Sequence, residues 1–129
     1  MDKISKNVKL FLAYGALMMA FAIAIGAFGA HGLKSIVEPD MLKVFHTGVE
    51  YQFYNALGLF AVAFVLYLKD SKKAFIAGLL IFIGMLIFST SLYFLVILNI
   101  PILGVITPIG GTMMVIGWGL LVYSIIKEL

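Results

Sequence analysis

Charged residues are missing from long stretches of this chain, and the alternation of apolar and charged segments predicts four helices that cross a membrane. No Asp, Glu, Lys or Arg occurs from Leu10 to Ala30 or from Ala74 to Ile126. The segment from Tyr51 to Leu68 is also uncharged. Because one membrane-spanning helix needs about 20 mostly apolar residues, the stretch that begins at Ala74 is long enough for two. We expect helices over residues 10–30, 44–68, 74–98 and 108–126.

The composition agrees with a single all-α membrane domain over residues 1–129. Hydrophobic residues make up 64% of the chain and charged residues only 12%, whereas soluble domains average about 25% charged residues. Inside a bilayer each backbone amide needs an internal hydrogen-bond partner, which a helix supplies. We therefore predict a bundle of four transmembrane helices, and we expect the lipid bilayer itself to be the first partner of the protein.

The lysines predict the orientation of this bundle. Seven of the nine lysines lie before the first predicted helix, between the second and third, or after the fourth. These three segments share one side of the membrane, so the positive-inside rule predicts that both termini are cytoplasmic. The net charge of +3 is explained in this way, and we expect no nucleic-acid partner. The first apolar stretch is longer than the roughly 7–15 residues of a secretory signal, so we expect it to be a retained helix.

The second predicted helix begins with a polar stripe. At 100° per residue one side of this helix carries Lys43, His46, Thr47, Glu50 and Tyr54. The opposite side carries Leu42, Phe45, Val49, Phe53 and Ala56. Because polar side chains inside a membrane usually face the bundle or a hydrated cavity, we expect the stripe to face inward. The apolar side should then meet lipid.

The predicted directions of the four helices bring polar residues to one leaflet, the outer one. The candidate ligand-binding residues there are His31, His46, Glu50, Tyr54, Ser89, Tyr93 and Thr107. A charged carboxylate within a span costs a few kcal/mol or more unless it is paired. We therefore expect Glu50 to be the central acceptor or proton carrier, with Tyr54 and Tyr93 as donors. This pocket would bind a small polar group, a lipid head group or a proton.

Other roles for these polar residues stay open. Glu50 could simply join helices through hydrogen bonds. His46 and Glu50 have the i, i+4 spacing of a zinc site to which His31 could add a ligand, but no HExxH motif is present. We predict no metal and no cofactor. The chain has no cysteine, and it has no nucleophile elbow, phosphate-binding loop or dinucleotide motif, so we do not expect an enzyme.

Small residues recur every fourth position in the first predicted helix. One line contains Ala16, Ala20 and Ala24, and a second contains Ala22, Gly26 and Ala30. Such lines let two helices approach closely. They fit packing within the chain, or an interface between copies of it. The alternative functions are therefore a structural or assembly partner in the membrane and a component of an oligomeric channel or transporter.

Proline marks two expected helix starts. Glu38-Pro39-Asp40 is typical of a start with proline in the first position. Thr107-Pro108 is similar, with Thr107 as the expected N-cap. The apolar segment between residues 102 and 106 is too short to span a bilayer.

Five motifs are spread along the chain: Gly26–Leu33, Thr47–Gln52, Phe88–Tyr93, Thr107–Gly111 and Gly117–Trp118. They resemble those of the YgdD/YwdK-like family, a domain of unknown function found in small four-span bacterial membrane proteins with eukaryotic relatives. They occur in the family's order over nearly the whole chain. The resemblance implies a multi-pass protein of the bacterial cytoplasmic (inner) membrane, and it supplies no catalytic residue. Asn55 lies near a position where some members have histidine, which weakens a histidine-based metal site.

Overall fold

The computed structural model describes residues 3–129, and these residues form an all-helical structure. Four long helices follow one another along the chain: α1 (Lys6–Phe28), α2 (Pro39–Leu68), α3 (Lys72–Ile97) and α4 (Thr107–Glu128). A π-helical turn, Gly29–Leu33, extends α1, and a short 3-10 helix, Pro101–Val105, precedes α4. All four long helices are long and apolar enough to cross a membrane. The prediction of four membrane-spanning helices is confirmed.

Local sequence explains where several helices begin. The hydroxyl of Ser5 accepts a hydrogen bond from the Val8 amide at 3.3 Å, and Ser71 caps α3 by accepting from the Ala74 amide at 3.1 Å. Helix α2 begins at Pro39, as the proline signal predicts. Thr107 is the first residue of α4 and Ile106 is its N-cap; the Thr107 hydroxyl does not cap the helix and is hydrogen-bonded to Ser91 at 2.6 Å.

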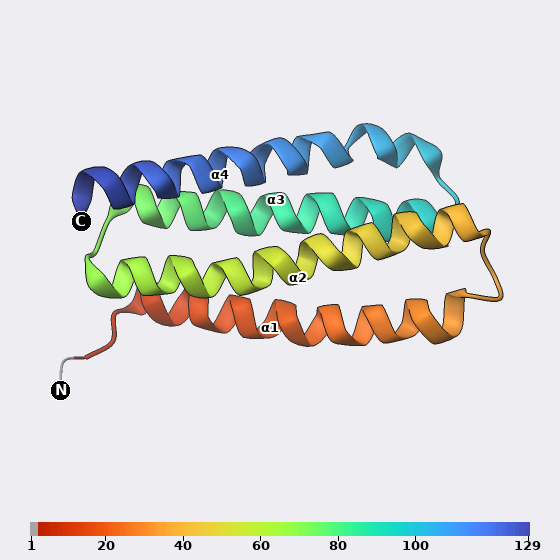
Figure 1. Cartoon of the computed structure of the whole chain (residues 1–129), viewed down its shortest axis with the longest axis horizontal. Coiled ribbons are helices and arrows are strands. Elements are labelled where there is room, and N and C mark those ends of the chain that lie inside the picture. Colours follow the sequence, from red (N-terminus) through yellow and green to blue (C-terminus); the bar gives the residue numbers. More distant parts are fainter. Residues whose placement is uncertain (1–2) are drawn as a thin grey trace.

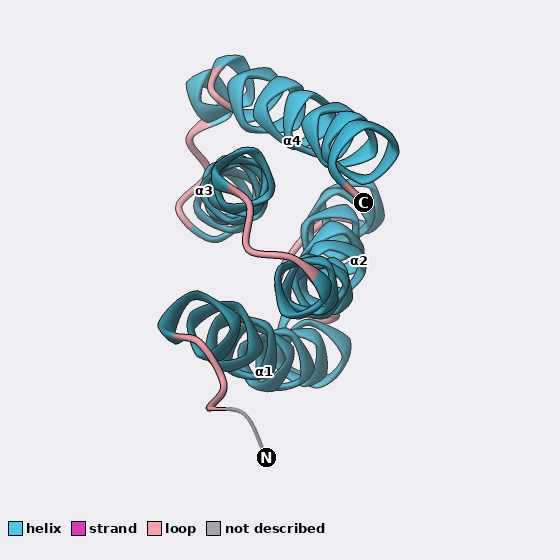
Figure 2. Ribbon diagram, turned by 90° about the vertical axis from the view of Figure 1, so that its left-hand side faces the viewer, coloured by secondary structure: helices cyan, strands magenta, loops and turns pink. Residues whose placement is uncertain are grey.

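The helices form a zigzag in which each one packs mainly against the next in sequence. The contacts join α1 to α2, α2 to α3 and α3 to α4. Seen along the helix axes, α1 and α4 lie at opposite ends of the row, with α2 and α3 between them (Figure 2). Helices α1 and α3 touch only slightly. Shallow spaces therefore remain on the two sides of the central α2–α3 pair.

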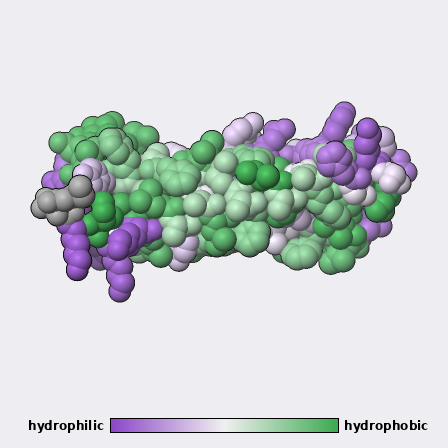
Figure 3. All heavy atoms as spheres, turned by 90° about the horizontal axis from the view of Figure 1, so that it is seen from below, coloured by the Kyte–Doolittle hydropathy of each residue, from purple (hydrophilic) through white to green (hydrophobic). Residues whose placement is uncertain are grey.

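The molecule has two polar ends and an apolar middle (Figure 3). One end holds the beginning of α1, the turn from α2 to α3 and the end of α4 (Figure 1). We call it the lysine-rich end because it carries Lys6, Lys9, Lys69, Lys72, Lys73 and Lys127. The opposite end, which we call the loop end, contains the segments 34–38 and 98–106. This arrangement matches an apolar belt in the bilayer between two hydrated surfaces.

Close helix contacts hold the apolar core together. Phe11, Leu59, Ile81 and Met85 are fully buried at its centre. Helices α3 and α4 meet backbone to backbone, since a Cβ atom on Gly110 would lie 2.5 Å from the Phe88 amide nitrogen. Lipid tails are as apolar as a protein core, so such close packing is a main source of helix association in membranes.

The predicted inward face of α2 is wrong. Phe45 and Ala56, assigned to lipid, are 0% exposed, whereas Tyr54 from the polar stripe is 59% exposed. Glu50 is exposed as well. Within lipid, close fit determines which face is buried, and Gly48 lies on the inner face, where a Cβ atom would stand 2.8 Å from the Tyr93 ring. The polar stripe can lie on the outside of the bundle because it belongs to the half of α2 that is nearer the hydrated loop end.

Candidate functional site

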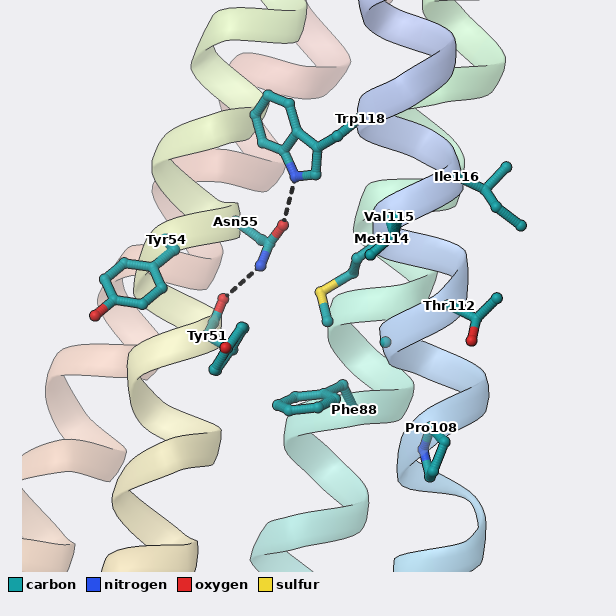
Figure 4. Close-up of a pocket in the computed structure, with 11 residues that line it drawn as sticks. Tyr51, Tyr54, Asn55, Phe88, Pro108, Thr112, Met114, Val115, Ile116 and Trp118 are labelled. Carbon is teal, nitrogen blue, oxygen red and sulfur yellow. Dashed lines mark hydrogen bonds between the residues drawn. The ribbon is translucent and has the colours of Figure 1, made fainter.

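One candidate site is a groove between α2 and α4, which we call the α2–α4 groove (Figure 4). It encloses about 720 Å³ and is open to the side of the molecule. This volume falls within the roughly 300–1,000 Å³ of small-molecule sites. Helix α2 contributes Tyr51, Tyr54 and Asn55, Phe88 comes from α3, and α4 lines the groove from Pro108 to Trp118.

A hydrogen-bonded bridge joins α2 to α4 at the lysine-rich end of this groove. The indole Nε1 of Trp118 donates to Asn55 Oδ1 at 2.9 Å, and Asn55 Nδ2 donates to the backbone oxygen of Tyr51 at 2.8 Å (Figure 4). Asn55 is only 5% exposed. The Trp118 ring packs directly over Gly58, where any side chain would collide with it. The bridge therefore closes the groove on that side.

Aromatic rings form the wall of the groove nearer the loop end. The centroids of Tyr51 and Phe88 are 4.8 Å apart, and those of Tyr51 and Tyr54 are 5.7 Å apart at an interplanar angle of 71°. Tyr51 is 41% exposed and Tyr54 is 59% exposed. Thr112 on α4 is exposed too. Tyr51, Tyr54 and Thr112 thus add exposed polar residues to a largely apolar lining.

Three of the predicted site residues are used in bonds between elements of the protein. Ser89 donates to the Gly48 backbone oxygen at 2.7 Å, and the Tyr93 hydroxyl donates to Gln52 Oε1 at 2.6 Å. Thr107 shares a 2.6 Å hydrogen bond with Ser91. All three predicted residues are buried. Their positions match the interpretation of polar residues as joints between helices.

The other four predicted residues lie toward the outside. His31, Glu50 and Tyr54 are exposed, and His46 is half-buried with its ring centroid 6.3 Å from that of Phe45. Tyr54 lines the α2–α4 groove, whereas Ser89 and Tyr93 line a different cavity. The structure therefore does not bring the seven residues together in one pocket. Within residues 3–129, no group of three His, Asp, Glu or Cys side chains could hold a metal ion.

The second cavity is the α1–α3 groove, which encloses about 400 Å³ on the other side of the central helix pair. Its polar lining residues are Gln52, Ser89, Thr90 and Tyr93. Gln52 joins three helices, because its Nε2 donates to the Met18 backbone oxygen at 2.9 Å while its Oε1 accepts from Tyr93. The rest of the lining is apolar.

Sequence reasoning missed Gln52 and Trp118 and treated Asn55 only as a departure from the family pattern. A signal for the two amides was present. Gln52 and Asn55 are three residues apart, and Gly48 and Ala56 each lie four residues from Gln52. Residues three and four apart share one helix face, so two amides lie on a face that also carries small residues, as expected for a contact between helices in a membrane.

Comparisons with known proteins identify similar chains. The model of the family described as "Protein of unknown function (DUF423)" matches residues 25–111. The UPF0382 membrane protein YwdK of Bacillus subtilis is 45% identical over 123 residues, which cover 95% of this chain and 100% of the relative. UPF0382 membrane protein SAB0533 of Staphylococcus aureus is 42% identical over 93% of this chain and 98% of its own. A UPF0382 membrane protein of Haemophilus influenzae is 42% identical over 92% of this chain and 94% of its own. No solved structure matches.

Proposed function

Because the chain belongs to the DUF423 family of membrane proteins, as the motif resemblance implied, we propose that it binds an amphiphilic molecule of the bilayer in the α2–α4 groove. The observation that carries this proposal is the side opening of a cavity of about 720 Å³, whose largely apolar lining includes the exposed residues Tyr51, Tyr54 and Thr112. The proposal is for binding and includes no catalytic step. The sequence led us to expect a small polar group, a lipid head group or a proton in a seven-residue pocket centred on Glu50, and the proposed site is instead the α2–α4 groove, which Tyr54 alone of those seven lines.

The groove suits an apolar tail. Ten residues of α4 separate Pro108 from Trp118, and at 1.5 Å per residue the groove is about 15 Å long. Phe88, Met114 and Val115 provide apolar lining along this length. A tail leaving bulk lipid gains little from the hydrophobic effect, since both environments are apolar. Selectivity for one amphiphile over another must therefore come from how closely its tail fits the groove and from the polar residues at the end nearer the loops.

The lysines support a particular orientation for the site. We place both termini in the cytoplasm of a bacterial cell and the loop end outside the cell. The aromatic wall of the groove, which is nearer the loop end, then lies in the outer leaflet. The absence of cysteine makes a direct test possible. Single variants Ser35→Cys and Asp70→Cys place thiols at opposite ends. An impermeant maleimide should label Ser35→Cys in intact cells and Asp70→Cys only after lysis, and the reverse result would invert the orientation.

Trp118 provides the test of groove binding. It is the only tryptophan of the chain and lines the deep end of the groove. Lipids with brominated tails should quench its fluorescence when a tail enters. In Gly111→Leu the new side chain would start against Phe88, 3.6 Å from its ring, and block the groove.

The matched control is Gly119→Leu, because no atom lies within 4 Å of a Cβ added there. Gly111→Leu should reduce the quenching by more than half, whereas Gly119→Leu should leave it unchanged. Equal quenching in all three proteins would show that tails do not enter the groove.

A second candidate function is assembly through α1. The predicted line Ala16, Ala20 and Ala24 is exposed, whereas Ala22 of the other line is 0% exposed. The first line is thus free to pack against another helix. Ala20→Leu should weaken a complex recovered by crosslinking in native membranes, and the equally exposed Ala61→Leu on α2 should not. A chain that crosslinks only as a monomer would remove this candidate.

A further inference from the structure

We propose that the α2–α4 groove selects amphiphiles with a simple ammonium head, held by the carboxylate of Glu50 and the rings of Tyr51 and Tyr54. This inference rests on the proposed function and names the ligand class for the same site. Neither the family nor its relatives' names assign any ligand. The inference joins three observations: an exposed carboxylate, an aromatic corner and an apolar groove beneath them.

Glu50 lies at a depth in the membrane where a bound cation would lower the cost of its negative charge. It precedes Leu68, the lysine-rich end of α2, by 18 residues, which is about 27 Å along the helix. The hydrocarbon core is about 30 Å thick, so Glu50 stands near its far edge. An exposed carboxylate at that depth is costly unless water or a cation accompanies it.

The Glu50 carboxylate lies one helical turn from a residue that lines the groove. Glu50 is four residues before Tyr54, so the two side chains are neighbours on one helix face. Tyr54 lines the groove. An amphiphile whose tail lies between α2 and α4 therefore has its head beside Glu50 when that head is small and directly joined to the tail.

The aromatic rings suit an ammonium group. Tyr51 and Tyr54 meet at 71° with centroids 5.7 Å apart, and Phe88 lies 4.8 Å from Tyr51. Rings set at a large angle present more than one face to the same space. Aromatic faces attract ammonium groups through their quadrupoles, and aromatic cages are a known means of binding quaternary ammonium ligands.

The charges on α2 argue against anionic and phospholipid heads. A sulfonate or phosphate joined to the tail would lie against the Glu50 carboxylate and be repelled. In a phospholipid the phosphate stands between the tail and any ammonium, so it would reach Glu50 first. Lys43 is seven residues further toward the loop end, about 10 Å along the axis, and exposed to water, so its charge is largely screened at Glu50.

The experiment uses the whole protein in uncharged maltoside micelles and follows Trp118 fluorescence. Three probes share one tail, brominated near its end, and differ in carrying a trimethylammonium, a sulfonate or an uncharged sugar head. The ammonium probe should reach half-quenching at about a tenfold lower concentration than either of the others. Glu50→Gln should remove most of this advantage while leaving quenching by the uncharged probe intact.

Matched variants distinguish an effect at the proposed site from an effect of net charge or of folding. Asp40→Asn removes the same charge from another exposed position on α2 and should keep the ammonium preference. Tyr54→Leu, which removes the aromatic ring, should weaken it several-fold. If the three probes quench equally while Gly111→Leu still blocks them, the head-group inference is overturned and groove binding stands. If Gly111→Leu blocks none of the probes, groove binding itself fails.

Discussion

The two grooves beside the central α2–α3 pair differ in volume and in how their polar residues are used. The α1–α3 groove of about 400 Å³ contains Gln52, Ser89 and Tyr93, which are hydrogen-bonded to the protein at 2.6–2.9 Å. In the α2–α4 groove of about 720 Å³, Tyr51 and Tyr54 are 41% and 59% exposed. A polar residue in a membrane helix is therefore informative about ligands only when its hydrogen-bonding groups remain accessible.

The same comparison separates stability from binding. Bonds between helices in membranes contribute about 0.6 kcal/mol each on average, with a maximum near 1.7 kcal/mol. Changes in the α1–α3 groove should therefore lower stability. Changes to accessible groups in the α2–α4 groove should alter binding and leave stability nearly unchanged.

The largest effect should follow from separating α3 from α4, which destroys one groove and spares the other. In Gly110→Leu the added Cβ would lie 2.5 Å from the Phe88 backbone nitrogen and 2.6 Å from the Gly84 oxygen. Backbone atoms cannot move aside as a side chain can, so we expect a loss of about 3 kcal/mol. Unfolding in increasing SDS measures it. A loss no greater than that of Gly119→Leu would contradict the observed helix contact.

Gln52→Leu should cost about 1–2 kcal/mol because it removes bonds to two other helices and leaves the Tyr93 hydroxyl unpaired. A double-mutant cycle with Tyr93→Phe, again by SDS unfolding, checks the cause. The two changes together should cost clearly less than the sum of the single changes. Strict additivity would mean that the two side chains do not interact in the membrane.

Asn55→Leu should cost less, about 0.5–1 kcal/mol, because it breaks one side-chain bond between helices. It also removes the partner of the Trp118 indole, so the emission maximum of this single tryptophan should shift to shorter wavelength. SDS unfolding and emission spectra give both quantities. A cost equal to that of Gln52→Leu would remove the energetic difference between the grooves.

The smallest effect should come from the same chemical change made in each groove. Tyr93→Phe loses a 2.6 Å hydrogen bond and should cost about 0.6 kcal/mol. Tyr54→Phe removes a hydroxyl from a side chain that is 59% exposed, and the free energy of unfolding should change by less than about 0.3 kcal/mol. If paired unfolding curves show equal losses of stability for Tyr93→Phe and Tyr54→Phe, the proposed difference between the two grooves is wrong.

The sequence was sufficient for the helices and insufficient for their faces. The uncharged stretches predicted four spans, and Pro39 marked the start of α2, because bilayer thickness and the geometry of proline act locally. The inward face of α2 was predicted wrongly from Glu50 and Tyr54. In lipid, burying the apolar face of a helix gains little free energy, because the lipid is apolar as well. The buried face of α2 is instead set by close packing around Gly48.

The candidate site shows the same limit at the level of single residues. Ser89 and Tyr93 were predicted as ligand groups, yet each donates a hydrogen bond to a neighbouring helix. Their partners, the Gly48 carbonyl and Gln52, are more than 40 residues away, so no local pattern reveals the pairing. Tyr54 was predicted as part of the site and does line the groove. The groove itself depends on how far α4 stands from α2, which composition does not encode.

The zigzag order of the helices also bears on how the chain is made. Since the main contacts join helices that are consecutive in the chain, each of these interfaces becomes available as soon as its second helix leaves the translocon. No helix has to wait for a distant partner, and contacts that are local in sequence form quickly. The α1–α2 hairpin, joined through Gln52 and the Met18 carbonyl, can dock while α4 is still in the ribosome. The bundle can thus assemble in the bilayer stepwise, with one helix interface forming after another.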